Sequence, residues 1–149
     1  MGRRPEVGQQ GFTLLELIVT LLILAIATGL AAPAIGRSAE TIRARAEVAR
    51  FSALLRHTRE QAITTRRPHS LTVDPIAHKV AIVAGDDEVR ETRALPADLA
   101  IEADPPPALT VRFEPHGVSS GGSFRVTTGA VRHRVRVDGL TGRVKAERE

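Results

Sequence analysis

The chain has 149 residues, a formal net charge of +4 at pH 7, and no Cys, Trp or Tyr. The lack of cysteine excludes disulfide bridges and thiol chemistry, and the scarcity of aromatic residues leaves Val, Leu, Ile and Ala to form most of the core. Charge is uneven: residues 37–67 are basic, residues 74–104 are acidic, and the chain is basic again from Arg112. This asymmetry fits subunits that stack through opposite patches, and it fits an ordinary solvated surface equally well.

A short polar leader, residues 1–11, precedes an apolar run from Phe12 to Ile35 in which Glu16 is the only charged residue. A helix rises about 1.5 Å per residue, so a run of this length exceeds the ~20 residues needed to cross a bilayer core. We therefore predict that residues 12–36 form the transmembrane half of an N-terminal helix. Because a carboxylate is costly in such a segment, we expect Glu16 to have a cationic partner.

The segment Gly11-Phe12-Thr13-Leu14-Leu15-Glu16, followed at once by the apolar run, resembles the class III signal of type IV pilins and type II secretion pseudopilins. The resemblance implies that a prepilin peptidase cuts after Gly11 and so removes residues 1–11 as a leader. It also implies that the same enzyme methylates the new amino terminus at Phe12. It also implies that Glu16 pairs with the terminal amine of a neighbouring subunit during assembly. The protein would then be single-pass in the inner membrane lipid, with a periplasmic C-terminal domain.

Other kinds of apolar segment fit less well. A secretory signal peptide could be cleaved near Ala25-Ile26-Ala27, but its h-region is shorter than this run. A plain signal anchor explains the length and leaves Glu16 without a role. A buried core helix that is apolar on all sides would need a larger domain around it.

The helix is predicted to continue through residues 37–67 as an amphipathic half. Pro33 cannot donate a hydrogen bond to the carbonyl of Gly29, so the helix should bend at this point. Apolar side chains recur on one face that should pack on a sheet, at Val48, Phe51, Leu55 and Ala62. The helix should end before Pro68, since the residue before a proline is disfavoured in the α region.

Beyond Pro68 the hydrophobic period changes from that of a helix to two, which is typical of strands. We expect short strands at 70–73, 79–83, 89–95, 99–103, 109–113, 123–128, 130–137 and 143–146. Residues rich in Gly, Pro and Asp separate them. The predicted fold class is therefore α+β, with a long N-terminal helix packed on a small antiparallel sheet or sandwich formed by residues 68–149.

Two C-terminal segments, Phe113-Glu114-Pro115-His116-Gly117 and Leu140-Thr141-Gly142-Arg143-Val144, are similar to those of minor pseudopilin H (the GspH family) and its FimT-like minor-pilin relatives. The resemblance implies a structural subunit of the type II secretion pseudopilus, whose partners are other pseudopilins and the prepilin peptidase. It implies neither enzymatic activity nor a cofactor. The alternative is a minor type IV pilin of the FimT kind, involved in pilus assembly and in binding or uptake of DNA.

Alternating basic residues form the candidate polyanion contact, at Arg132, Arg134, Arg136, Arg143 and Lys145. Alternation places the first three on one face of a strand, and the other two repeat this spacing on the next strand. Such a face can bind phosphates, or it can simply keep an edge strand from aggregating. Gly142-Arg143 resembles the basic segment tied to DNA uptake in FimT-like relatives, although Lys145 stands where a second arginine is expected.

Two weaker patterns carry no function in this interpretation. Gly117-Val118-Ser119-Ser120-Gly121 fits the nucleophile elbow of hydrolases, but a strand follows it and no histidine lies beyond His133. Asp86-Asp87-Glu88 lacks the alternating oxygen ligands of a calcium loop and is predicted to be a solvated turn. The histidines show no metal-ligand spacing.

Overall fold

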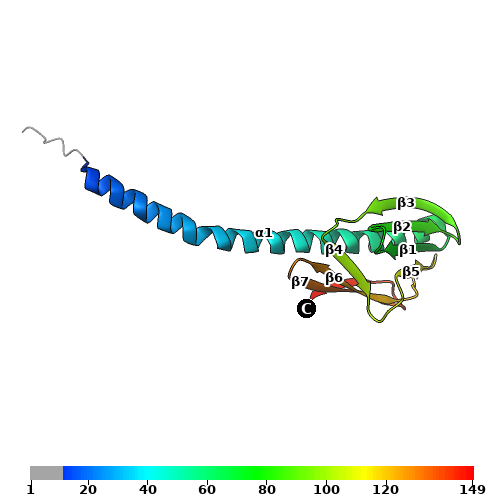
Figure 1. The fold of residues 1–149 in the computed structure, drawn as a ribbon. Coiled ribbons are helices and arrows are strands. Elements are labelled where there is room, and N and C mark those ends of the chain that lie inside the picture. The colour runs from blue at the N-terminus through cyan, green and yellow to red at the C-terminus, as the bar shows by residue number, and fades with distance from the viewer. Residues whose placement is uncertain (1–11) are drawn as a thin grey trace, which may run out of the picture. The chain divides into compact units, whose positions relative to one another are not determined.

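The computed structural model describes residues 12–149, except for the side chains of residues 30–38. The described residues divide into two compact units, with the boundary between Ala39 and Glu40. One helix, α1 (Leu14–Thr65), contributes to both units and runs without interruption past Gly29 and Pro33 (Figure 1). The bend expected at Pro33 falls where side chains are not described, and it stays a prediction.

The helix begins at a polar cap. The backbone N–H of Leu17 donates to the carbonyl of Thr13 at 3.2 Å, and that of Glu16 donates to Thr13 Oγ1 at 3.2 Å. The carbonyl of Thr13 thus accepts the first regular bond of the helix, and its hydroxyl satisfies one N–H group that has no backbone partner. All described side chains between Phe12 and Thr28 are exposed. In the part of the chain that the structure describes, no helix is both long and apolar enough to cross a membrane.

The C-terminal part of α1 presents a continuous buried stripe. The stripe recurs every three or four residues and consists of Ala44, Val48, Phe51, Leu55, Thr58 and Ala62. This spacing keeps one face of a helix toward the core, as the sequence predicted. The helix ends at Thr65, Arg66 adopts a left-handed backbone with φ of 53°, and Pro68 follows.

Eight strands follow the helix and form two antiparallel sheets. The first sheet has the order β3-β2-β1-β5 and the second has the order β4-β6-β7-β8. The strands are β1 (His69–Asp74), β2 (Lys79–Ala84), β3 (Glu88–Ala94), β4 (Leu99–Ala103), β5 (Thr110–Phe113), β6 (Gly122–Thr128), β7 (Val131–Val137) and β8 (Val144–Arg148). Each predicted strand is present within two residues of its expected bounds, so the predicted α+β fold is confirmed.

A single core joins the helix to both sheets. Phe51 of α1 meets Phe124 of β6 edge to face, with ring centroids 5.3 Å apart. Leu71 and Val111 enter the same core from the first sheet. In Figure 1, β1–β3 and β6–β7 lie on either side of the C-terminal half of α1. Truncating a buried phenylalanine to alanine costs about 3–5 kcal/mol, so these contacts fix the helix against the sheets.

Strand β3 is the exception to alternating burial. Six of its seven residues are exposed and Glu91 is half-buried. β3 is an edge strand of the first sheet, and its charged side chains discourage pairing with other chains.

Candidate functional site

The predicted processing site lies at the start of the described chain. Gly11 falls outside the described residues, Phe12 is exposed, and Glu16 lies in the first turn of α1. A carboxylate is favoured there because the N-terminal end of a helix carries partial positive charge. Glu16 thus has a local structural reason to be acidic, besides the role in assembly that the resemblance implies.

The alternating arginines of β7 share the solvent face of the second sheet. His133, Val135 and Val137 point into the core, whereas Arg132 and Arg136 are exposed and Arg134 is half-buried. Strand β8 pairs with β7 so that Lys145 stands opposite Arg136. A shallow hollow of about 190 Å³ on this face is lined by Arg134, Arg136, Arg143 and Lys145, together with Asp138 and Glu147. Arg132 does not line it.

Arg134 differs from the other four basic residues because carboxylates surround it. Its guanidinium lies 2.6 Å from Glu149 Oε1 and 3.3 Å from Asp104 Oδ2. Arg125 of β6 shares both acids, at 3.4 Å each. The hydrogen bond from Arg134 is the main cause that lowers the pKa of the Glu149 carboxyl. The network of Arg125, Arg134, Asp104 and Glu149 thus neutralises Arg134 within the fold.

Strand register explains how these charges meet. Glu102 of β4, Arg125 of β6, Arg134 of β7 and Glu147 of β8 stand opposite one another in turn across the sheet. Glu102 and Glu147 attract the arginines opposite them, whereas Arg125 and Arg134 are like charges that face each other. The carboxylates of Asp104 and Glu149, which both arginines share, offset this repulsion, and such a network is more effective than an isolated surface pair. The sequence pattern alone does not identify Arg125 and its acids as a site, although Arg125 alternates with buried Phe124 and Val126.

The remaining predicted cations are not neutralised in this way. Among the side chains that the structure describes, no carboxylate lies within ion-pair distance of Arg132, Arg136, Arg143 or Lys145. These four residues keep the capacity to contact an anionic partner.

The serine-containing turn is a structural feature. Ser119 Oγ donates to the carbonyl of Asp138 at 3.0 Å, which ties this turn to the β7–β8 turn. The Asp138 carboxylate accepts hydrogen bonds from the hydroxyl and backbone N–H of Thr141, and these lower its pKa. Arg59 Nε of α1 donates to the carbonyl of Gly117 at 3.1 Å. The helix and the two turns are therefore held together, and Ser119 is engaged in the backbone rather than poised for attack.

A buried histidine lies beneath the second sheet. His133 of β7 faces the core, and its Nδ1 has no hydrogen-bond partner among the described residues. Burial lowers the pKa of His133, and the positive charges of Arg148 and Arg45 lower it further. His133 is therefore neutral at physiological pH. No group of three or more His, Asp or Glu within the described chain could hold a metal ion.

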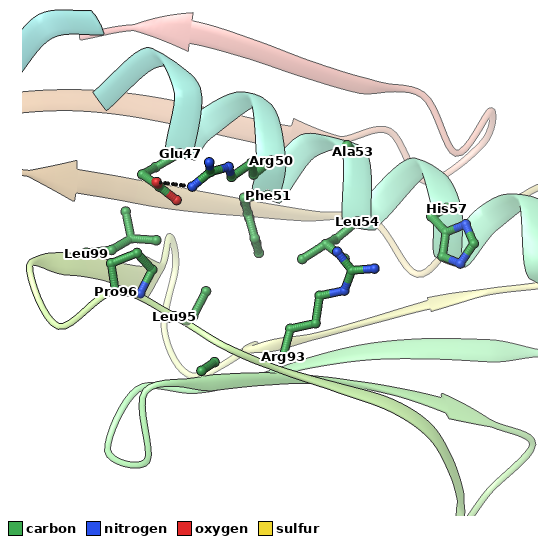
Figure 2. A pocket seen from close by; sticks show the side chains of 11 residues that line it. Glu47, Arg50, Phe51, Ala53, Leu54, His57, Arg93, Leu95, Pro96 and Leu99 are labelled. Atoms are coloured by element: carbon green, nitrogen blue, oxygen red, sulfur yellow. Dashed lines mark hydrogen bonds and ion pairs between the residues drawn. The ribbon is translucent and has the colours of Figure 1, made fainter. Parts of the chain in front are cut away.

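A groove of about 660 Å³ opens between α1 and the β3–β4 connection. Figure 2 shows Phe51 and Leu54 on the helix side and Leu95 and Leu99 on the other. Its rim carries the Glu47–Arg50 ion pair, with the two atoms 2.6 Å apart. The sequence analysis did not predict this groove, because its two walls are separated by about forty residues and only the tertiary fold unites them.

Two family models match the chain. One, described as Type II transport protein GspH, matches residues 47–141, which extend from the second half of α1 to the turn after β7. The other, described as the prokaryotic N-terminal methylation motif, matches residues 8–32 and so includes Gly11, Phe12 and Glu16. Strand β8 lies outside both matches.

Solved structures of two individual proteins are similar in fold to this chain. The type IV minor pilin FimU of Pseudomonas aeruginosa matches with a TM-score of 0.61 and 15% identity, over 72% of this chain and 90% of FimU. The minor pseudopilin EpsH of the Vibrio cholerae type 2 secretion system matches with a TM-score of 0.53 and 13% identity, over 73% of this chain and 96% of EpsH. At these identities the likeness shows the fold alone, which is pilin-like.

A relative in sequence is closer. Type II secretion system protein H of Xanthomonas campestris pv. campestris is 30% identical over 151 residues, which cover 95% of this chain and 86% of that protein. This alignment and the match over residues 47–141 show that the chain belongs to the GspH family of type II transport proteins.

Proposed function

We propose that this protein is a minor pseudopilin, a structural subunit of the type II secretion pseudopilus that acts in protein secretion across the outer membrane. The observation that carries the proposal is the GspH match over most of the folded domain, joined to an N-terminal methylation motif on the same chain. The pilin-like fold is consistent with this role. The groove and the exposed cations offer surfaces for contact with other pseudopilins.

The N-terminal segment supplies the proposed route into the filament. A prepilin peptidase cuts between Gly11 and Phe12 and methylates Phe12, and residues 12–36 hold the subunit in the inner membrane with its domain in the periplasm. What supports this is the apolar run from Phe12 to Ile35 and the methylation motif over residues 8–32. Glycine at position 11 suits cleavage because it has no side chain to hinder close approach to the scissile bond.

Intact mass measurement of the membrane-bound protein tests this route. Cells with an active prepilin peptidase should yield a chain that begins at methylated Phe12. Gly11→Leu should leave the full precursor, whereas Gln10→Leu, a control with the same side chain one position earlier, should be processed normally. A full-length, unmethylated chain in wild-type cells would contradict the route.

The FimT-like alternative rests on the exposed cations of the second sheet. Arg132, Arg136, Arg143 and Lys145 could neutralise phosphates, and affinity for DNA would then fall steeply with salt. Arg134, which the sequence analysis grouped with them, is already paired with Glu149 and Asp104. The likeness to FimU concerns the fold alone, so the secretion role is preferred.

A further inference from the structure

The outer edge of β8 is an unpaired strand edge. The backbone of Asp138 donates to the carbonyl of Arg143, and that of Glu149 donates to the carbonyl of Arg132, so odd-numbered residues of this segment hydrogen-bond to β7. Because strand residues alternate, the N–H and C=O groups of Val144, Ala146 and Arg148 point away from β7. Within residues 12–149 no strand pairs with this edge. Three residues thus offer donors and acceptors to an additional strand.

A hollow lies between this edge and the helix. It has a volume of about 590 Å³ and is lined on the helix side by Arg56, Arg59, Glu60 and Ile63 and on the strand side by Arg143 and Val144. Ile63 is 41% exposed, and Val144 packs against the core while remaining only half-buried. The methyl side chain of Ala146 takes little space along the same edge. A strand added to β8 would therefore find apolar surface for the side chains on its inner face.

The charges around this edge are mainly positive, although the exposed Glu147 lies on the same face of β8 as Lys145. Among the described side chains, no carboxylate lies within ion-pair distance of Arg56, Arg143, Lys145 or Arg148. Arg45 of α1 and Arg148 of β8 both lower the pKa of the His133 imidazole, so both lie near it. Arg45 therefore adds positive charge at the end of the edge where Arg148 lies. Glu60 is the one acid that lines the hollow.

The edge of the other sheet shows what a neutralised edge looks like. In β3, Glu88 is paired with Arg90 at 3.2 Å and with Arg67 at 3.7 Å, and Glu91 is paired with Arg93. Charges of one sign keep two copies of an edge apart, and the same charges attract a strand of the opposite sign. The excess of positive charge at the edge of β8 therefore favours an acidic segment, and a second β8, which carries both Lys145 and Glu147, is an outcome that the test must distinguish.

We propose that the outer edge of β8 binds an extended acidic segment of a partner protein, which adds a fifth strand to the second sheet. Backbone groups of Val144, Ala146 and Arg148 supply the pairing, as in other cases of strand addition. Alternate acidic side chains of the segment meet Arg143 and Lys145 on the solvent face, and the apolar side chains between them rest on Ile63 and Val144. The inference rests on the proposed role as an assembly subunit and names the chemistry of one partner.

The test uses the full-length chain in detergent and a blocked seven-residue peptide in which Glu alternates with Val. Amide hydrogen exchange is followed by NMR. At saturating peptide, the amides of Val144, Ala146 and Arg148 should exchange at least about tenfold more slowly, because edge amides that are open to water become hydrogen-bonded. A control peptide with Lys in place of Glu should leave these rates unchanged.

Variants separate backbone pairing from charge. Ala146→Pro removes one outward N–H, a position where an edge strand tolerates proline, and should weaken peptide binding by about tenfold or more. Ala146→Ser keeps the N–H and should bind normally. If the proline variant loses its native spectrum, the double change Arg143→Ala and Lys145→Ala tests the charge contact and should weaken binding comparably, while Lys79→Ala on the other sheet should not.

Several results would overturn the proposal. The first is peptide binding that leaves the amides of the three residues unprotected, and the second is equal binding of the lysine peptide. The third is protection of the same amides without peptide that increases with protein concentration, which would indicate pairing with a second copy. Full competition by a duplex oligonucleotide would assign the surface to nucleic acid instead. Processing at Gly11 is measured independently, so failure of the strand proposal and failure of the proposed function give different results.

Discussion

Glu16 can act at the start of α1 in two ways that substitution separates. Thr13 and Glu16 have the Thr-x-x-Glu spacing of a capping box, and the N–H of Glu16 donates to Thr13 Oγ1. A glutamate in the first turn also interacts favourably with the helix dipole. Pairing with a neighbouring subunit's amine, by contrast, requires the full negative charge. Glutamine preserves a side-chain oxygen that can cap the helix, whereas valine does not.

We predict that Glu16→Gln and Glu16→Val both enter the membrane and are both processed, and that both fail to join the pseudopilus. The measurement is the yield of cross-links to other pseudopilins in intact cells. A capping contribution is about 0.5–2 kcal/mol and would affect only the valine variant. Normal cross-linking of the glutamine variant, with loss in the valine variant, would show that Glu16 serves the helix rather than the assembly.

At the level of single residues, the sequence predicts which face of a strand a side chain lies on better than it predicts which side chains form ion pairs. Alternation correctly places Arg132, Arg134 and Arg136 on one side of β7. It does not reveal that Asp104 and Glu149 neutralise Arg134, because these acids lie 30 and 15 positions away in the chain. Which side chains meet across a sheet depends on strand register, and register follows from the packed core rather than from local pattern.

At the level of elements, the sequence predicts most of the fold. A period of two with Gly, Pro and Asp at the turns marks most of the eight strands, with β3 as the exception, and the buried stripe from Val48 to Ala62 marks the helix face. The groove lined by Phe51, Leu54, Leu95 and Leu99 could not be predicted. It arises where the β3–β4 connection passes the helix, and loop paths of this kind have no local periodicity.

The turn between β7 and β8 provides a prediction at this scale. Gly142 has φ of +63°, and a Cβ there would lie 2.3 Å from the carbonyl oxygen of Gly117 and 2.7 Å from Arg59 Nε. Gly85 is a matched control, since it has φ of +65° and its nearest side-chain atom, in Arg67, is 3.7 Å away. Gly142→Ala should lower the free energy of unfolding by about 3 kcal/mol or more, and Gly85→Ala by about 1–2 kcal/mol.

Urea unfolding of the full chain in detergent, followed by the circular dichroism of the sheets, measures both glycine variants. The difference between them isolates the collision with Gly117 and Arg59 from the shared cost of a left-handed backbone. Equal losses in the two variants would mean that the helix and the two turns are not held together as tightly as the structure shows.

For the whole molecule, the uneven charge of the sequence is partly cancelled by folding. Arg112 binds Asp86 and Glu114 at 3.2 and 3.0 Å, and these hydrogen bonds raise the pKa of its guanidinium. Arg67 and Glu88 likewise join a basic segment to an acidic one. Among the described side chains, cations without an ion-pair partner gather beside β8, at Arg143, Lys145 and Arg148, alongside the exposed Glu147. Such an arrangement suits a subunit that contacts its partners through defined surfaces.

We propose that this chain serves protein secretion. The most direct measurement compares cells that lack its gene with cells that carry it again, by quantifying proteins in the culture medium and DNA uptake in the same cultures. We predict that substrates of type II secretion disappear from the medium and accumulate in the periplasm, that reintroduction of the gene restores them, and that DNA uptake is unchanged. Normal secretion together with lost DNA uptake would contradict the claim and favour the minor type IV pilin.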